Sequence, residues 1–387
     1  MLNKIDIAII QNHFNKRLEH QYSDVIHLER SFSWLKYCQD RTGTGGVAGF
    51  YSLFKGWYHA YPETTGYIIQ SFVDYYKKNN DEDFLVRAVR MGDWEIDIQL
   101  PDGGVRGFCL KKTISDTPLI FDTGQVLFGW ISLYRLTGEK KYLDAATRAS
   151  LWLIKHQEAD GTWNNFLYKR HCGTYFSRVA WGMLQTANES RREDIRKGAV
   201  AFLNWVLTQQ NSAGFFSNIG FTPTSHNFTH NISYTIEGLI GAADEIDDPA
   251  LSKRYLDAAM LTAEKLIREF SRKETFFGEY HFDFSPVNHD YICVTGTIQL
   301  AWCFLKLYRR SNHIELWNKA VMLLEEAKSV QLVNTGNPAF DGSIVGSYPV
   351  WGGYQSWRLV SWSAKFFADA LMEKMTLMEE YPSLKHQ

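Results

Sequence analysis

Four acidic residues stand at or near the starts of apolar segments, where they could act as proton donors and acceptors. Glu63 lies in YPETTGYI, Asp122 in FDTGQVLFG, Asp290 in NHDYICVTG and Glu237 in SYTIEGLIGAA. A carboxylic acid can protonate a leaving oxygen while a carboxylate activates water, so two such residues could hydrolyse a glycosidic bond. Glu63, Asp122 and Asp290 are therefore candidate catalytic residues. Their structural alternative is an ordinary place at a helix start, where acidic side chains are favoured.

Tyrosine and histidine residues near the same segments permit a different chemistry. Tyr61, His171, His230 and Tyr234 could remove and return the proton next to a uronate carboxyl group, as an epimerase or a lyase does. Arg178 could hold that carboxylate with two parallel hydrogen bonds. The residues alone do not decide between hydrolysis and proton abstraction, and both reactions remain open at this stage.

The aromatic content is high, with 13 Trp, 20 Tyr and 25 Phe, and aromatic faces suit the apolar faces of sugar rings. We expect most of one aromatic set to line a single cleft: Trp57, Tyr61, Tyr67, Tyr234, Trp351, Tyr354 and Trp357. Polar residues predicted to bind substrate beside them are His59, Gln125, Arg178 and Glu237.

Metal binding is not indicated by the sequence. His226 and His230 are four residues apart, which can place two imidazoles on one helical face, but no glutamate completes an HExxH motif. The five cysteines are scattered without a CxxC pair, which suits neither a zinc site nor a disulfide framework. We therefore predict no metal and no cofactor.

A repeated pattern reveals the elements that must position these residues. W-x4-Q-x3-G occurs four times, beginning at Trp34, Trp94, Trp152 and Trp205, with weaker copies at 255–270 and 316–332. The spacing of roughly 60, 58 and 53 residues fits one helical hairpin with its loops. Six such hairpins fill the chain and predict an all-α fold, an (α/α)6 toroid. The repeated Trp, Gln and Gly are explained by helix packing, carbonyl pairing and helix termination.

Within each repeat an amphipathic helix ends at a Gly-containing turn, and a more apolar helix follows after a loop. A helix that is apolar nearly all round is buried, so the second helix of each pair should form the inner ring. We expect inner helices to begin near residues 64, 123, 175, 231, 294 and 354, with their N-termini at one mouth. Residues 1–24 are predicted to be an extension packed on a single toroid domain, 25–387.

Two family resemblances follow from quoted segments. WLIKHQEADGTW (152–163) resembles the QW motif of terpenoid cyclases, which are α/α toroids, but their acidic DxDD signature is absent. The segments at 56–68, 119–129, 233–243 and 347–371 together resemble a bacterial toroid family of surface-polysaccharide clusters. That family is related in fold to the C-terminal domain of glucuronyl C5-epimerases and to unsaturated uronyl hydrolases. The resemblance implies work on carbohydrate without fixing the reaction.

The leading functional hypothesis is an enzyme acting on an acidic, uronate-containing glycan by general acid–base chemistry, similar to an epimerase or lyase. The alternatives are a glycoside hydrolase with paired carboxylates, a non-catalytic glycan-binding or scaffold toroid, and a terpenoid cyclase-like enzyme. A net charge of −2 with interleaved signs argues against a nucleic-acid partner. No apolar run approaches the length of a membrane span, and we expect a cytoplasmic protein. The oligomeric state is not indicated.

Overall fold

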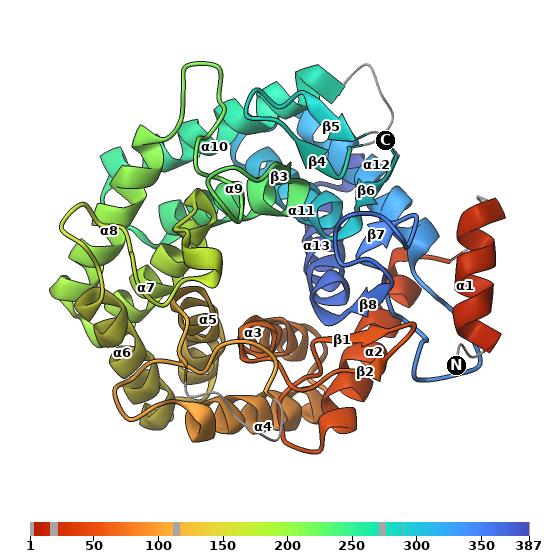
Figure 1. Ribbon diagram of the computed structural model, residues 1–387, viewed down its shortest axis with the longest axis horizontal. Helices are drawn as coiled ribbons and strands as arrows, with labels where there is room; N and C mark the ends of the chain where they lie inside the picture. Colours follow the sequence, from red (N-terminus) through yellow and green to blue (C-terminus); the bar gives the residue numbers. More distant parts are fainter. Residues whose placement is uncertain (1–3, 16–21, 111–116, 271–275, 289, 387) are drawn as a thin grey trace.

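The computed structural model describes residues 4–15, 22–110, 117–270, 276–288 and 290–386. Within them, twelve of the helices form two concentric rings, and the chain alternates between the outer and the inner ring (Figure 1). The fold is the predicted (α/α)6 toroid. Its outer helices are α2 (Asp24–Thr42), α4 (Glu82–Ile98), α6 (Lys140–Lys155), α8 (Glu193–Thr208), α10 (Pro249–Phe270) and α12 (Ile314–Val330).

The inner helices begin close to the predicted residues in five of six cases. They are α3 (Pro62–Asn79), α5 (Ile120–Thr137), α7 (Ser177–Ser190), α9 (Thr229–Glu245), α11 (Val294–Ser311) and α13 (Ser361–Glu380). The start expected near residue 354 was wrong. The chain there forms bends and turns, and β8 (Arg358–Val360) then pairs with β1 (Phe50–Ser52) before α13 begins.

Each inner helix contacts the next inner helix, and α13 contacts both α2 and α3, so the last hairpin closes against the first. The inner helices approach one another closely at some points. A Cβ atom on Gly66 of α3 would lie 2.5 Å from the Val126 Cα of α5, and one on Gly129 would lie 2.4 Å from the Gly66 oxygen. Glycine at these positions therefore lets α3 and α5 pack backbone to backbone.

The repeated glutamine joins neighbouring outer helices, as its proposed pairing with carbonyl groups requires. The Gln157 side-chain nitrogen donates to Gly161 O in its own turn and to Gly198 O in α8. Gln331 in the last repeat donates to Gly342 O and to His27 O in α2. This last bond links the end of the outer ring to its beginning. Each of these glutamines thereby ties the turn after its own helix to the backbone of the next outer helix.

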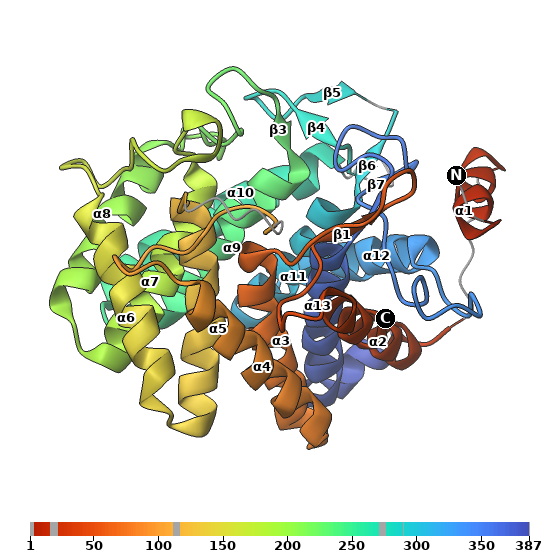
Figure 2. The same cartoon turned by 60° about the horizontal axis from the view of Figure 1, so that its bottom comes forward.

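Short strands and long loops gather at one end of the helical rings (Figure 2). They join into small antiparallel sheets, one with the strand order β2-β1-β8 and another with the order β3-β4-β5. The bounds of the remaining strands are β2 (Gly56–Trp57), β3 (Asn227–Phe228), β4 (Glu279–Tyr280), β5 (Pro286–Asn288), β6 (Ile292–Cys293) and β7 (Ser347–Tyr348). These strands lie in the connections that precede the inner helices.

Helix α1 (Lys4–Asn15) precedes the rings and contacts the segment before α13. His13 Nδ1 accepts a hydrogen bond from the Val350 amide, and the Phe14 ring lies 4.4 Å from the Trp351 ring. Among the described residues, no helix combines the length and the apolar character that crossing a bilayer requires.

Candidate active site

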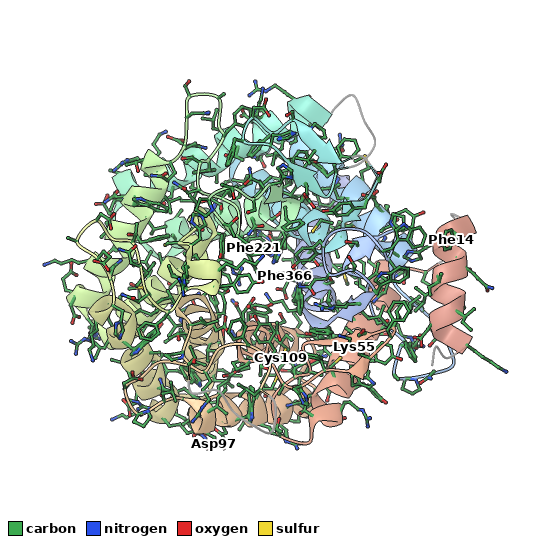
Figure 3. The ribbon with its side chains drawn as sticks, viewed as in Figure 1. Phe14, Lys55, Asp97, Cys109, Phe221 and Phe366 are labelled. Carbon is green, nitrogen blue, oxygen red and sulfur yellow. The ribbon has the colours of Figure 1, made fainter. Side chains whose placement is uncertain are left out.

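A pocket of about 490 Å³ opens where the inner helices begin. Eleven of its 18 lining residues are aromatic, so most of its wall can contact the apolar faces of a sugar ring. The aromatic residues are Phe50, Tyr58, Tyr61, Phe108, Phe121, Tyr168, Tyr175, Phe221, Tyr234, Tyr354 and Trp362. The other residues are Glu63, Cys109, Leu119, Asp122, His230, Gln355 and Arg358. Figure 3 places Cys109 and Phe221 near the central opening of the toroid.

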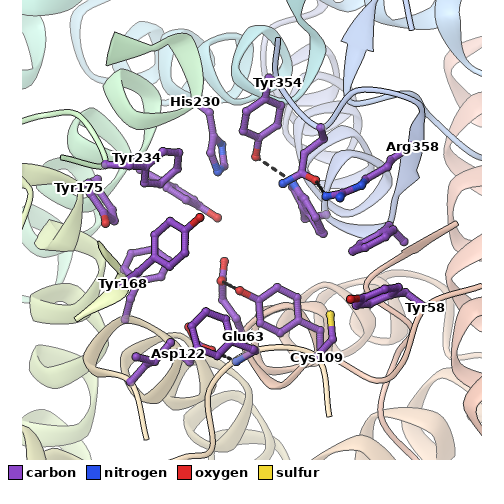
Figure 4. Close-up of a pocket in the computed structure, with 18 residues that line it drawn as sticks. Tyr58, Glu63, Cys109, Asp122, Tyr168, Tyr175, His230, Tyr234, Tyr354 and Arg358 are labelled. Atoms are coloured by element: carbon purple, nitrogen blue, oxygen red, sulfur yellow. Dashed lines mark hydrogen bonds between the residues drawn. The ribbon is translucent and has the colours of Figure 1, made fainter. Parts of the chain in front are cut away.

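Two carboxyl groups enter this pocket from neighbouring inner helices (Figure 4). Glu63 lies in the first turn of α3, and its Oε2 accepts a hydrogen bond from the Tyr61 hydroxyl. Asp122 lies in the first turn of α5, and its Oδ2 accepts a 2.8 Å hydrogen bond from the Phe108 amide. Neither residue is the N-cap of its helix. The close packing of α3 on α5 at Gly66 brings the two helix starts together.

The two carboxyl groups influence each other's protonation. Burial raises the pKa of Glu63 to about 7, although the Tyr61 hydrogen bond and the positive charge of Arg178 oppose that rise. Burial, and then the negative charge of Glu63, raise the pKa of Asp122 well above its usual range. Glu63 has the groups that favour its ionised form, so we assign the retained proton to Asp122. An acid and a base then share one pocket.

His230 and Tyr234 enter from the first turns of α9, and Figure 4 shows them across the pocket from Glu63 and Asp122. The His230 ring lies 4.1 Å from the Tyr234 ring and 5.0 Å from the Tyr354 ring. Burial lowers the pKa of His230 to about 3, so its imidazole is neutral at physiological pH. The structure therefore brings the predicted residues His230, Tyr234 and Tyr354 together with Tyr61, Glu63 and Asp122.

Arg178 does not line the pocket, which contradicts its predicted contact with a substrate carboxylate. It is buried beneath the floor, paired with Glu237, and its Nε donates a 2.9 Å hydrogen bond to Gln125 Oε1. Gln125 and Glu237, also predicted to bind substrate, are buried with it and do not line the pocket. Tyr67 is fully buried below them, and its ring packs 5.4 Å from Phe366. Tyr67, Gln125 and Glu237 lie at least one turn inside their helices, whereas Arg178 is the second residue of α7.

Three predicted tryptophans lie outside the pocket. Trp57 packs on Tyr51 and Tyr37, at 5.4 and 5.5 Å between ring centroids. Trp351 and Trp357 pack on each other, at 5.9 Å. The expectation that most of the aromatic set lines one mouth was therefore wrong: only Tyr61, Tyr234 and Tyr354 of the seven line it. Trp57 lies in β2, whereas Trp351 and Trp357 lie in turns before β8.

The remaining predicted residues are also outside the pocket. His59 is exposed beside β2, Asp290 is exposed before β6, and His171 is buried in the loop before α7. His226 is exposed and bonds to Glu279, so it does not converge with His230. Asp290 has His289 as its neighbour in the sequence, and His289 lies outside the described residues. Across the described part of the chain, no group of three His, Cys, Asp or Glu side chains is placed to hold a metal ion.

Arg358 is the functional candidate that the sequence reasoning missed. It is the one lysine or arginine that lines the pocket within the described residues. Its guanidinium lies 4.3 Å from the centre of the Phe50 ring, and one nitrogen donates to Gln355 Oε1. Those contacts orient the group while leaving other N–H donors for a ligand. Arg358 directly follows Trp357, one of the predicted substrate-binding residues, and this proximity could have indicated it. It was overlooked because we expected a helix to begin near residue 354.

No protein-family model and no curated protein matches this chain. Solved structures match it in fold. An unsaturated glucuronyl hydrolase specific for heparin has a TM-score of 0.72 and 12% identity, over 91% of this chain and 97% of that chain. The unsaturated glucuronyl hydrolase from Bacillus sp. GL1 has a TM-score of 0.70 and 13% identity, over 93% and 97%. A sugar epimerase from a ruminal bacterium has a TM-score of 0.69 and 12% identity, over 95% and 98%.

These similarities span nearly the whole length of each protein, at identities of 12–13%. Similarity at this level establishes the α/α toroid fold. It confirms the likeness in fold to unsaturated uronyl hydrolases that the sequence segments predicted, and it leaves the reaction to be argued from the residues of the pocket.

Proposed function

We propose that this chain is a carbohydrate-active enzyme that hydrolyses a uronate-containing oligosaccharide by general acid–base catalysis. The main support is the carboxyl pair, Glu63 and Asp122, in a pocket with mostly aromatic walls. Their raised pKa values place a proton donor and a proton acceptor side by side near neutral pH. Pairs of titratable groups with separated pKa values are typical of acid–base sites.

In the proposed reaction, the proton on Asp122 passes to the oxygen that leaves as the C–O bond breaks. Water adds to the carbon, and the proton it loses passes to the Glu63 carboxylate. The Tyr61 hydroxyl donates to Glu63 and so favours its ionised, basic form. The two proton transfers balance, because one proton leaves Asp122 and one arrives at Glu63.

The acidic sugar is proposed on the strength of Arg358. A guanidinium at the pocket wall can hold a carboxylate with charge-assisted hydrogen bonds. Phe50 and Gln355 fix its position, so little side-chain freedom is lost on binding. Two of the similar structures are named as unsaturated glucuronyl hydrolases, and one of these as responsible for the degradation of glycosaminoglycan. Those names agree with a uronate substrate.

An epimerase or lyase reaction is the second candidate. His230 and Tyr234 face the carboxyl pair from the other side of the pocket, so a sugar between them would have proton-transferring groups on both faces. Epimerisation needs removal of a proton from one face and its return to the other. The similar sugar epimerase agrees with this alternative.

One experiment separates these reactions. The protein is incubated with unsaturated glucuronyl oligosaccharides, saturated uronate oligosaccharides and neutral oligosaccharides in heavy water, and the products are followed by proton NMR. New reducing ends support hydrolysis, whereas deuterium next to the uronate carboxyl group supports epimerisation and a new double bond supports elimination. Saturable binding without any turnover would overturn the proposed catalysis and favour a glycan-binding toroid.

A further inference from the structure

A continuous set of buried hydrogen bonds runs from the pocket into the floor of the toroid. His230 Nδ1 lies 2.5 Å from Gln299 Oε1, and Gln299 Nε2 lies 3.0 Å from Glu237 Oε2. The other Glu237 oxygen pairs with Arg178, which also donates to Gln125. All five side chains are at most 5% exposed. The set joins residues of α5, α7, α9 and α11.

The direction of each bond follows from what its groups can donate. Arginine only donates, so the Glu237 carboxylate paired with Arg178 acts as the acceptor, and its other oxygen faces Gln299 as an acceptor too. The Gln299 side chain must then turn its NH₂ group toward Glu237, which leaves its oxygen toward His230. An amide oxygen only accepts, so the hydrogen must lie on His230 Nδ1. The other ring nitrogen, Nε2, is left with a lone pair.

We propose that this set of bonds holds His230 neutral with its proton on Nδ1, so that Nε2 accepts a hydrogen bond from a hydroxyl group of the substrate. His230 then contacts the sugar, while Gln299 and Glu237 are positioning residues that act through it. The proposal rests on the proposed function, because it takes the ligand of the pocket to be a sugar. Figure 4 shows the His230 ring pointing into the pocket.

The surroundings keep His230 from taking a second proton. Burial, with the positive charge of Arg178 below, lowers its pKa, and the Gln299 bond opposes this only in part. The groups packed on its ring are the neutral phenols of Tyr234 and Tyr354. Burial raises the pKa of both phenols well above the ordinary value, so neither supplies a negative charge. The acceptor on Nε2 is therefore maintained at the pH where Glu63 and Asp122 exchange protons.

A second histidine–glutamine pair provides a matched comparison. His27 Nδ1 lies 2.5 Å from Gln331 Oε1, the same length as in the His230 pair, between α2 and the end of α12. Gln331 also closes the outer ring through His27 O and Gly342 O. It does not line the pocket. Replacing Gln331 therefore removes a similar bond with a structural role and no contact to the substrate site.

The test combines ¹⁵N NMR of histidine-labelled protein with steady-state kinetics. His230 is assigned by the signal lost in His230→Gln, and we expect its proton on Nδ1 at neutral pH. In Gln299→Met, Nδ1 loses its acceptor, so the Nε2–H form should appear and kcat/KM should fall at least tenfold. Gln299→Leu also removes the acceptor and should cause the same change of tautomer and a similar loss. Gln331→Met should lower the melting temperature and leave kcat/KM and the His230 signals unchanged.

An Nε2–H tautomer in the unaltered protein would overturn the proposal, as would full activity in Gln299→Met with the proton of His230 on Nε2. If Gln299→Met does not fold, Gln299→Leu and the tautomer of the unaltered protein decide the matter. Absence of turnover on every glycan together with an Nδ1–H signal would contradict the proposed hydrolysis but not the bond directions. Binding would then be compared between the unaltered protein and Gln299→Met. Equal glycan affinity in that comparison would overturn the role of Nε2 as the substrate's acceptor.

Discussion

Glu63 and Asp122 lie in the first turns of adjacent inner helices and line the same pocket, where the negative charge of Glu63 raises the pKa of Asp122. The meeting depends on the backbone. Residues without a Cβ atom, above all Gly66, allow α3 and α5 to approach, and each carboxyl group lies in the first turn of its helix. The same geometry places an acid and its base at the positive ends of two helices, where a carboxylate is tolerated in an otherwise apolar setting.

Replacing either carboxyl group should reduce hydrolysis of a uronate oligosaccharide by at least about 100-fold, since general acid–base catalysis contributes about that much. The variants are Glu63→Gln and Asp122→Asn, which keep the side-chain shape. Asp97→Asn is the control, because Asp97 is exposed on an outer helix away from the pocket (Figure 3). Unchanged kcat/KM in both variants, with intact folding, would move the catalytic assignment to His230 and Tyr234.

The pH dependence of activity should be bell-shaped. Because Glu63 acts ionised and its pKa is about 7, kcat/KM should rise with pH through about 7. It should fall at higher pH, as Asp122 loses the proton that burial and Glu63 help it retain. The profile is measured on the free enzyme at low substrate concentration. A kcat/KM that stays constant from about pH 6 to about pH 8 would exclude Glu63 as the base.

Much of this architecture could be predicted from the sequence, because the repeated Trp, Gln and Gly report on contacts made once per hairpin. Glu63, Asp122 and His230 lie in the first turns of their helices and reach the pocket, whereas Arg178, also in a first turn, is buried beneath it. The pattern fails in the irregular segment before α13. Arg358 and Trp357 are neighbours in the sequence, yet one lines the pocket and the other packs on Phe54. Trp357 lies in a turn and has a positive φ of 61°, whereas Arg358 begins β8, and no repeat in the sequence predicts this change of backbone conformation.

Glu95 should destabilise the protein at neutral and higher pH. It is fully buried in α4, and neither of its carboxyl oxygens has a hydrogen-bond partner among the residues that the structure describes. Burial, and then the charge of Asp122, raise its pKa well above the ordinary value. The folded state thus binds the proton more tightly, and this contribution to stability is complete below the unfolded pKa and lost as pH rises through the folded one.

Glu95→Gln should therefore flatten the decline of the unfolding free energy above about pH 5, and raise stability at high pH by about 1–3 kcal/mol. Urea denaturation at several pH values measures this, with Glu82→Gln on the exposed start of α4 as the control. An identical pH slope in Glu95→Gln and in the unaltered protein would contradict the raised pKa of Glu95.

Gly66→Ala should destabilise the toroid by about 1–3 kcal/mol, the usual cost of adding a methyl group where nothing can move aside. The new Cβ would meet the Val126 Cα and the Gln125 backbone oxygen, both fixed in α5. Gly198→Ala is the comparison, since the three atoms nearest to its Cβ would belong to the side chains of Ile154, Gln157 and Met183. Denaturant unfolding measures both, and an equal or smaller loss in Gly66→Ala would argue against close contact of α3 and α5.

Arg358→Gln should act on substrate choice more than on the chemical step. Its guanidinium is proposed to hold a uronate carboxylate, and a charge-assisted hydrogen bond contributes about 1.5–3 kcal/mol, so KM for a uronate oligosaccharide should rise about 10- to 100-fold. The same variant should leave any activity on a matching neutral oligosaccharide nearly unchanged, because that substrate lacks the carboxylate.

Arg358→Lys keeps the charge but loses the paired donors. Its KM for the uronate oligosaccharide should therefore lie between those of the unaltered protein and of Arg358→Gln. The measurement is kcat and KM for both substrates with all three proteins, and Lys55→Gln, on the exposed turn between β1 and β2, is the control for general loss of charge. Equal losses on acidic and neutral substrates would show that Arg358 maintains the pocket through Phe50 and Gln355 and does not recognise the acidic group.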